Sequence, residues 1–225
     1  GVFLSGGVDS STLVTVMREV SSSNIKSFSI GFEDDSFNEL PYAREVAQHF
    51  DTDHYDLVVK PDALDLLPKL VRAFDEPFAD SSAIPMYYLS ELARRHVTVA
   101  LGGDGGDELF AGYETYTAYK MAELYHYLPQ SLQTFLPRLI AKLPVSHAKV
   151  SFDYKAKRFM QSALLPPERR HYAWKEVFSD EMKDQLYTGP TNSALQDPFQ
   201  VFAREFGSCQ NHPMLSRLQY VDQRV

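Results

Sequence analysis

The sequence predicts an α/β protein, in which an open parallel sheet is flanked by helices and followed by a helical C-terminal lobe. Three observations predict this fold. Strand-like apolar runs alternate with helical patterns through the first half of the chain. Two of these runs lead into glycine-rich stretches. From Tyr113 onward, the sequence is rich in helix formers, aromatic residues and prolines but has no convincing strand-like run.

The alternation of strands and helices starts at the first residues, because the apolar run VFL precedes a stretch with helical spacing. The expected elements in chain order are a strand at 2–4, a helix over 13–20, a strand at 25–32, a helix over 38–50, a strand at 54–59, helices over 61–74 and 83–96, and a strand at 97–103. We therefore expect an α/β core over residues 1–118 and a helical lobe over residues 119–225.

Composition argues against several classes of protein. The 22 Lys+Arg and 30 Asp+Glu residues give a net charge of −8, which disfavours binding to a phosphate backbone. The single cysteine, Cys209, permits no internal disulfide, and no stretch is long and apolar enough to span a bilayer. We expect a cytoplasmic protein with no nucleic-acid or membrane partner. The chain starts inside a strand-like run without Met, so we also expect it to be a fragment.

The stretch SGGVDSS lies between the first predicted strand and the first predicted helix. Gly6 and Gly7 let the backbone approach an anion, Ser5 and Ser10 supply hydroxyl donors, and the helix N-terminus offers unpaired N–H groups. The pattern predicts a phosphate cradle, and it is not of the Walker type because no lysine follows the glycines. A valine at either glycine is expected to remove anion binding while leaving the fold largely intact.

A carboxylate in a phosphate cradle repels its ligand unless a divalent cation bridges the two, so Asp9 predicts Mg²⁺. The second glycine-rich stretch, LGGDGGDE, offers Asp104, Asp107 and Glu108, of which Asp107 is the expected second ligand. Simpler interpretations stay open for each stretch alone. The first is also compatible with a tight turn in which Asp9 or Ser10 caps the helix, and the second with an acidic loop.

Four stretches in order, SGGVDSS, FSIGF, DEPFADSSAIP and LGGDGGDELFAGY, resemble the synthetase domain of glutamine-hydrolysing asparagine synthetases. The first is similar to the pyrophosphatase loop of N-type ATP pyrophosphatases. The resemblance continues more loosely through YKAKRFMQ and YAWKEVFSDEMKDQL, and so covers essentially the whole chain. It implies the fold of the adenine nucleotide alpha-hydrolase-like, or HUP-like, proteins.

The resemblance implies site residues at the matching positions. It places the pyrophosphate loop at Ser5, Gly6, Gly7, Asp9 and Ser10, and the adenosine contacts at Phe3, Leu4, Ile30, Gly102 and Gly103. It implies Mg²⁺ ligands at Asp9 and Asp107, and a site for the acceptor and its acyl-adenylate at Asp104, Glu108 and Tyr113.

The reaction implied is ATP-dependent adenylation of a carboxylate, with aspartate expected, followed by release of pyrophosphate and amide formation with ammonia. The ammonia would come from an N-terminal glutaminase domain on the same full-length chain. Many family members have Ser-Gly-Glu-Gly-Ser-Asp where this chain has residues 102–107, GGDGGD, which leaves a different acceptor open. Two alternatives remain, another ATP pyrophosphatase ligase and a nucleotide-binding module without chemistry, and a homodimer is left open.

The family also places a catalytic lysine and a Val-Asp-Arg signature beyond the last residues of this chain, YVDQRV. Lys26 and Lys120 have no evident route to the phosphates, since one follows the first helix and the other follows the second glycine-rich stretch. We therefore expect these 225 residues alone to bind ATP weakly at best and to be inactive as a ligase.

Overall fold

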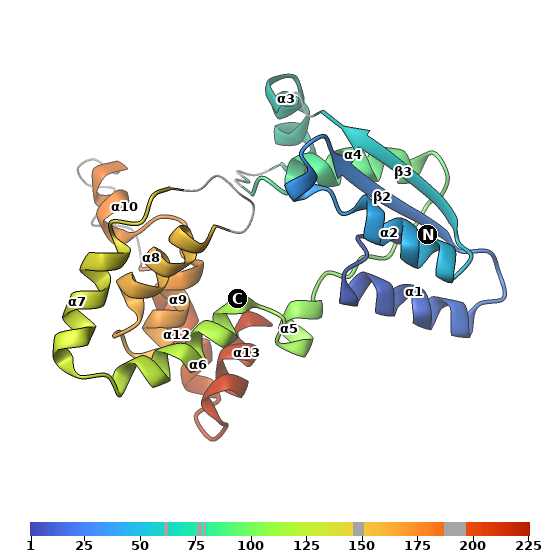
Figure 1. The fold of residues 1–225 in the computed structure, drawn as a ribbon. Coiled ribbons are helices and arrows are strands. Elements are labelled where there is room, and N and C mark those ends of the chain that lie inside the picture. Colours follow the sequence, from blue (N-terminus) through green and yellow to red (C-terminus); the bar gives the residue numbers. More distant parts are fainter. Residues whose placement is uncertain (61–62, 76–77, 79, 146–150, 187–196) are drawn as a thin grey trace. The chain divides into compact units, whose positions relative to one another are not determined.

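The computed structural model describes the chain except for residues 61–62, 76–77, 79, 146–150 and 187–196 (Figure 1). The chain divides into two compact units, Gly1–Asp104 and Gly105–Val225. This boundary lies earlier than the one predicted between residues 118 and 119. Residues just after 104 belong with the second unit because helix α13 (Met214–Asp222) holds them. Its Gln219 side chain donates hydrogen bonds to two carbonyl oxygens at positions 108 and 109, at 2.9 and 2.7 Å.

The first unit is built on a parallel three-stranded sheet in the order β1-β2-β3. The strands are β1 (Val2–Phe3), β2 (Lys26–Phe32) and β3 (Asp53–Val59). Val2 pairs with Ser27, and every residue of β2 pairs with a residue of β3. Since parallel strands end at the same edge, the loops that follow β1 and β2 lie at one edge of the sheet.

The fourth strand expected at residues 97–103 forms as a single isolated bridge, in which Leu101 pairs in parallel with Val2. The Phe3 N–H donates to the Leu101 carbonyl at 2.8 Å, and the Leu101 N–H donates to the Gly1 carbonyl at 2.9 Å. Because β1 is two residues long, it offers this segment few ladder hydrogen bonds. The segment nevertheless runs beside β1, so Gly102 and Gly103 follow it at the same edge of the sheet.

Helices cover both faces of the sheet (Figure 1). The helical elements of this unit are α1 (Val8–Val20), η1 (Asp35–Phe37), α2 (Leu40–His49), α3 (Ala63–Phe74) and α4 (Ala83–Arg94). Helices α1 and α2 bury one face in a core of Val2, Leu4, Val14, Ile25, Ala43 and Ala47. On the opposite face, near α4, Phe28 stacks on Tyr55 with ring centroids 5.5 Å apart. The predicted sheet flanked by helices is confirmed.

The described elements of the second unit are all helices, which confirms the predicted helical lobe. They are α5 (Gly106–Phe110), α6 (Glu114–His126), α7 (Gln130–Ile140), α8 (Phe152–Ser162), α9 (Pro167–Lys175), α10 (Asp180–Leu186), α12 (Phe199–Ser208) and α13. One core cluster buries Tyr116, Phe202, Phe206, Leu218 and Val221. These apolar residues come from α6, α12 and α13, so packing among these helices holds the unit together.

A second part of this core is organised around a charged side chain, Arg170 of α9, which is fully buried. Its guanidinium donates to the Ala163 carbonyl at 3.0 Å and to Glu123 at 2.8 Å. It also lies 5.2 Å from the ring centroid of Tyr119 and 5.7 Å from that of Trp174. A buried cation is tolerated where hydrogen bonds and aromatic faces replace its water, as they do here.

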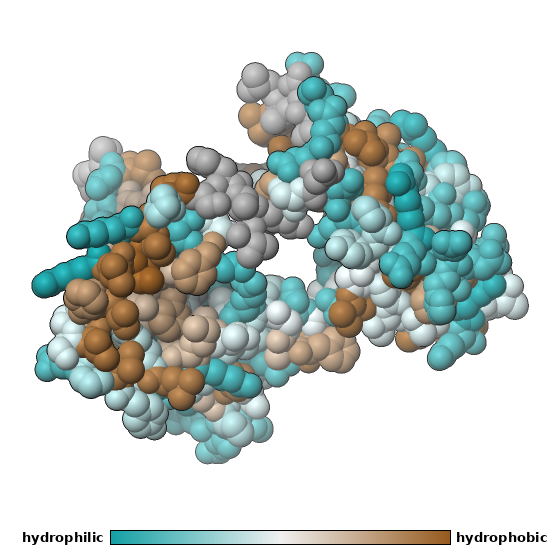
Figure 2. Space-filling model, in the orientation of Figure 1, coloured by the Kyte–Doolittle hydropathy of each residue, from teal (hydrophilic) through white to brown (hydrophobic). Residues whose placement is uncertain are grey.

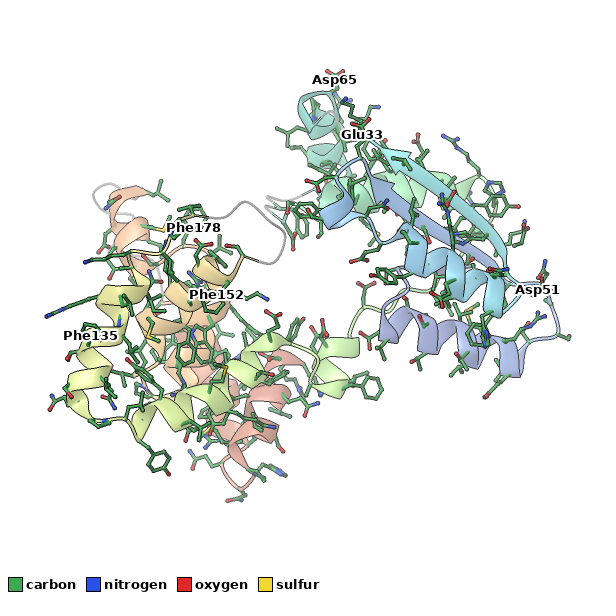
Figure 3. The ribbon with its side chains drawn as sticks, viewed as in Figure 1. Glu33, Asp51, Asp65, Phe135, Phe152 and Phe178 are labelled. Atoms are coloured by element: carbon green, nitrogen blue, oxygen red, sulfur yellow. The ribbon has the colours of Figure 1, made fainter. Side chains whose placement is uncertain are left out.

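Apolar side chains also lie on the surface of the helical unit (Figure 2). Figure 3 shows Phe135 on α7 and Phe152 on α8, and these side chains are 56% and 72% exposed. Leu132 and Leu139 on α7 are exposed as well. These residues therefore contribute little to the core of the unit. Among the described residues, no helix combines the length and the apolar composition needed to cross a membrane.

Candidate functional site

The loop after β1 has a shape fixed by its own serines. The backbone N–H groups of Ser5 and Gly7 donate to the hydroxyls of Ser10 and Ser5, each at 3.2 Å, and the two hydroxyls lie 3.0 Å apart. Helix α1 then begins at Val8 with Gly7 as its N-cap and no side-chain cap. The interpretation in which Asp9 or Ser10 caps the helix is therefore wrong. An uncapped helix start leaves backbone N–H groups for an anion.

Gly6 is required by the fold of this loop. Its φ is +81°, a conformation that residues with a Cβ rarely adopt. A Cβ at this position would lie 2.5 Å from the Tyr42 Cβ and 2.7 Å from the Ala43 nitrogen, both in α2. The expectation that a valine at Gly6 leaves the fold largely intact is therefore wrong, because backbone atoms of α2 occupy the space. At Gly7, beyond its chain neighbours, a Cβ would meet the Ser5 hydroxyl at 3.2 Å as its one contact among the described residues, so the expectation stays a prediction there.

The second glycine-rich stretch reaches the start of α1. A Cβ at Gly103 would lie 3.2 Å from the Ser10 nitrogen and 3.3 Å from the Asp9 Cβ. A Cβ at Gly102 would lie 2.5 Å from a carboxylate oxygen of Asp104, so this carboxylate folds back over Gly102. The first unit thus brings together the predicted pyrophosphate loop and the two glycines that were predicted to contact adenosine.

The other predicted adenosine contacts lie in different surroundings. Phe3 lines an open cavity of about 690 Å³, with Tyr87 and Ala93 of α4 among its walls. Ile30 is half-buried in β2. Leu4 is 3% exposed and its side chain packs in the core with α1 and α2, so the backbone of Leu4 is the part near the loop.

The two predicted magnesium ligands belong to different units. Asp9 is half-buried in the first turn of α1 and forms no ion pair with any residue that the structure describes. Asp107 lies in the first turn of α5, and its carboxylate packs over Gly112. Within the described ranges, no group of three His, Cys, Asp or Glu residues is arranged to hold a metal. Each residue by itself supplies one carboxylate, the oxygen ligand that Mg²⁺ prefers, and the shared metal stays a prediction.

Glu108 and Tyr113, two of the predicted acceptor residues, contact each other directly. The Tyr113 hydroxyl donates a hydrogen bond to the Glu108 carboxylate. This hydrogen bond, with burial, holds the pKa of Tyr113 well above its ordinary value. The chain turns back between them at Ala111, whose φ is +58°. Helix α13 fixes the Glu108 backbone, because the Gln219 amide donates to its carbonyl oxygen at 2.9 Å.

A cavity of about 620 Å³ lies within the helical unit beside this pair. Its charged lining includes Glu108, Lys175 and Asp222, and its apolar lining includes Phe178 and Phe202. The structure thus places two predicted acceptor residues, Glu108 and Tyr113, on the wall of one cavity. Asp104, the third predicted acceptor residue, belongs to the first unit.

One residue that sequence reasoning missed is Asp222 on α13, whose side chain is 3% exposed. Its carboxylate accepts hydrogen bonds from the Tyr116 hydroxyl at 2.6 Å and from His171 Nε2 at 2.9 Å, and Lys175 Nζ lies 2.7 Å away. Burial by itself raises the pKa of Asp222, but the hydrogen bonds and charge of these partners outweigh it and hold the pKa below its ordinary value. No sequence motif joins these residues, since His171 and Asp222 are 51 positions apart.

Comparison with known proteins decides the family. The family model described as asparagine synthase matches residues 1–224, which is nearly the whole chain. The chain belongs to the asparagine synthase family. The predicted resemblance to this family is therefore confirmed. Of the stretch DEPFADSSAIP, residues 76, 77 and 79 lie outside the described residues.

The family member from Bacillus subtilis named asparagine synthetase [glutamine-hydrolyzing] 1 is 34% identical over 225 residues, which cover 99% of this chain and 34% of that protein. A putative asparagine synthetase [glutamine-hydrolyzing] 2 from Methanocaldococcus jannaschii is 41% identical over 192 residues, 83% of this chain and 36% of that protein. The human asparagine synthetase [glutamine-hydrolyzing] is 32% identical over 124 residues, 50% of this chain and 22% of that protein. The chain spans about a third of the length of the first two relatives.

Proposed function

We propose that this chain is the synthetase part of a glutamine-dependent asparagine synthetase, or of an amidotransferase like it, and uses ATP to convert a carboxylate into an amide. The observation that carries the proposal is the loop at the start of α1. Its serines hold it open, Gly7 leaves the helix N-terminus uncapped, and Gly103 packs against Asp9 and Ser10. Membership of the family, whose named members are asparagine synthetases, supports the same reaction.

In this proposal the β- and γ-phosphates of ATP lie on the loop formed by Ser5–Ser10. The serine hydroxyls and the backbone N–H groups at the start of α1 donate hydrogen bonds to the phosphate oxygens. Asp9 and Asp107 would hold Mg²⁺, which supplies the positive charge that the loop lacks. No lysine or arginine occurs between residues 5 and 17, so the neutralising charge must come from outside the loop.

The acceptor, for which we propose aspartate, and its acyl-adenylate would bind beside Glu108, Tyr113 and Asp104. One carboxylate oxygen of the acceptor attacks the α-phosphorus of ATP, the bond to the β-phosphate oxygen breaks, and pyrophosphate leaves with the electron pair. Ammonia then attacks the acyl carbon, AMP leaves, and the amide forms after loss of a proton. Much of the acceleration in such a reaction comes from positioning the two substrates and from stabilising charge on the leaving group.

The glutaminase domain of the same full-length protein is our proposed source of ammonia, and the cytoplasm is our proposed location. The first proposal rests on the relatives, which are named glutamine-hydrolyzing, and the second on the single cysteine, which is typical of proteins in a reducing compartment. The reduced, buried Cys209 does not contribute to the chemistry, because its thiol is 8% exposed and donates to a backbone carbonyl inside the helical unit.

The test is acceptor-dependent pyrophosphate release by the full-length protein with ATP, Mg²⁺, ammonia and a panel of carboxylates. We expect aspartate to give the highest rate, and Asp9→Asn to reduce this rate at least about a hundredfold. Thr12→Val is the matched control, because Thr12 lies one turn further along α1 and its hydroxyl bonds the Val8 carbonyl of the same helix. If no carboxylate in the panel raises pyrophosphate release above background, the ligase proposal is contradicted and a binding module is favoured. If another carboxylate gives the highest rate, only the choice of aspartate as the acceptor is contradicted.

A further inference from the structure

The ring of Tyr113 has a charged neighbour that sequence reasoning did not identify. The ammonium of Lys175, at the last position of α9, lies 4.2 Å from the centre of the Tyr113 ring. A cation over an aromatic face attracts the ring, and more strongly where water is largely excluded. Lys175 is about one third exposed, so part of its side chain is sheltered by the protein. This contact restrains the orientation of the ring.

The ammonium is itself held in place by Asp222. The distance between Lys175 Nζ and the Asp222 carboxylate is 2.7 Å. Asp222 is held by two further partners, since His171, which is fully buried, and the Tyr116 hydroxyl both donate to it. The carboxylate thus has little freedom to turn, and a lysine paired with it is fixed more firmly than one paired at the surface.

The ring of Tyr113 determines where its hydroxyl lies, and that hydroxyl donates to the Glu108 carboxylate. We propose that Lys175 and Asp222 are positioning residues for the acceptor, and that they act by holding the Tyr113 ring where its hydroxyl bonds Glu108. The inference rests on the proposed function, in which the acceptor binds beside Glu108 and Tyr113. It adds two residues, from α9 and α13, that act on the acceptor site through Tyr113.

The experiment compares Lys175→Met with Lys175→Arg in the full-length protein. Methionine keeps the length and apolar stem of lysine but removes the cation, whereas arginine keeps a cation that can lie on the ring and pair with Asp222. We expect Lys175→Met to raise the acceptor KM about tenfold and to leave the ATP KM unchanged. In Lys175→Arg the acceptor KM should rise by at most half as much on a logarithmic scale, which is about threefold. Asp222→Asn is expected to raise the acceptor KM in the same direction.

Lys157→Met is the matched control. Lys157 is 30% exposed against 33% for Lys175, and it likewise pairs with a buried carboxylate of the helical unit, Asp153, at 3.6 Å. Within the described part of the chain, it forms no hydrogen bond or ion pair with Glu108 or Tyr113. We expect the acceptor KM of Lys157→Met to equal that of the parent protein. An equal change in both variants would mean that Lys175 serves general stability, and would overturn the inference.

A second measurement separates this inference from the proposed function. In protein with ¹³C-labelled tyrosine rings, the signal of Tyr113 is the one that disappears in Tyr113→Phe. We expect this signal to shift at neutral pH in Lys175→Met and to remain in place in Lys157→Met, whether or not the parent releases pyrophosphate. An unchanged Tyr113 signal in Lys175→Met would overturn the inference even if the ligase activity were established.

Discussion

Replacing Gly6 by alanine tests how far the glycine-rich loop of residues 5–10 depends on the packing of α2. In the structure Gly6 has a φ of +81°, and a Cβ there would lie 2.5 Å from the Tyr42 Cβ and 2.6 Å from its carbonyl carbon. Two of the three nearest atoms are backbone atoms of α2, which cannot move without moving the helix. The substitution Gly6→Ala should therefore destabilise the first unit as well as reshape the loop.

The magnitude follows from two costs. A residue with a Cβ in the left-handed conformation loses about 1–2 kcal/mol, and forcing an extra carbon into occupied space costs about 1–3 kcal/mol. Together these give about 2–5 kcal/mol for Gly6→Ala. Gly7→Ala is the matched comparison, because its φ is −69° and its Cβ would meet the Ser5 hydroxyl at 3.2 Å. Alanine is a poorer N-cap than glycine, so we expect a loss of at most about 1 kcal/mol there.

Hydrogen exchange measured by mass spectrometry is the suitable assay, because Trp174, the single tryptophan, lies in the other unit and does not report on the sheet. Peptides that cover β2 should exchange at least roughly thirtyfold faster in Gly6→Ala than in the parent, and less than about fivefold faster in Gly7→Ala. Equal acceleration in both variants would refute the argument from the position of α2. Gly7→Ala is also the variant in which a loss of ATP binding can be measured without loss of the fold.

Three further predictions concern the metal, the buried arginine and the buried carboxylate. Asp9→Asn should weaken ATP binding at least about tenfold in Mg²⁺, measured by calorimetry, because the ion loses a ligand; equal affinity would contradict the shared ion. Arg170→Met should cost about 2–4 kcal/mol in urea denaturation followed by Trp174 fluorescence, because buried hydrogen bonds are lost. Replacing the exposed Arg204 by Met should change the free energy of unfolding by no more than about 0.5 kcal/mol. Similar losses of stability in Arg170→Met and Arg204→Met would contradict the role of the buried hydrogen bonds. Because the pKa of Asp222 is lowered in the folded state, its stabilising contribution is present above about pH 4 and is lost as the pH falls through the folded pKa. The difference in urea midpoint between the parent and Asp222→Asn should therefore shrink as the pH falls below about 4, and a constant difference would contradict the assignment.

Local sequence signals were sufficient for the family, for most of the elements in their order and for the glycine-rich loop after β1, whose binding of phosphate stays a prediction. Strands of a parallel sheet are apolar runs, and helices carry apolar residues at a period near four, so both can be recognised without tertiary contacts. The glycines and serines of SGGVDSS act within seven consecutive positions, which is why Ser5, Gly7 and Ser10 could be predicted to form one loop. The strand expected at 97–103 did not form beyond Leu101, because pairing depends on the length of the neighbouring strand as well as on the segment itself.

Tertiary structure decided the features that join distant segments. A side chain is disfavoured at Gly6 because Tyr42 and Ala43 of α2 lie next to it, and nothing in the seven loop residues indicates where Tyr42 lies. The contact between Lys175 and Tyr113 and the pairing of Lys175 with Asp222 join α9, α13 and the residue before α6. Such contacts have no local spacing, because they depend on how helices pack and on which buried charges then need a partner. The sequence by itself therefore determined the loop that is proposed to bind the nucleotide, whereas helix packing decided how the proposed acceptor site is held.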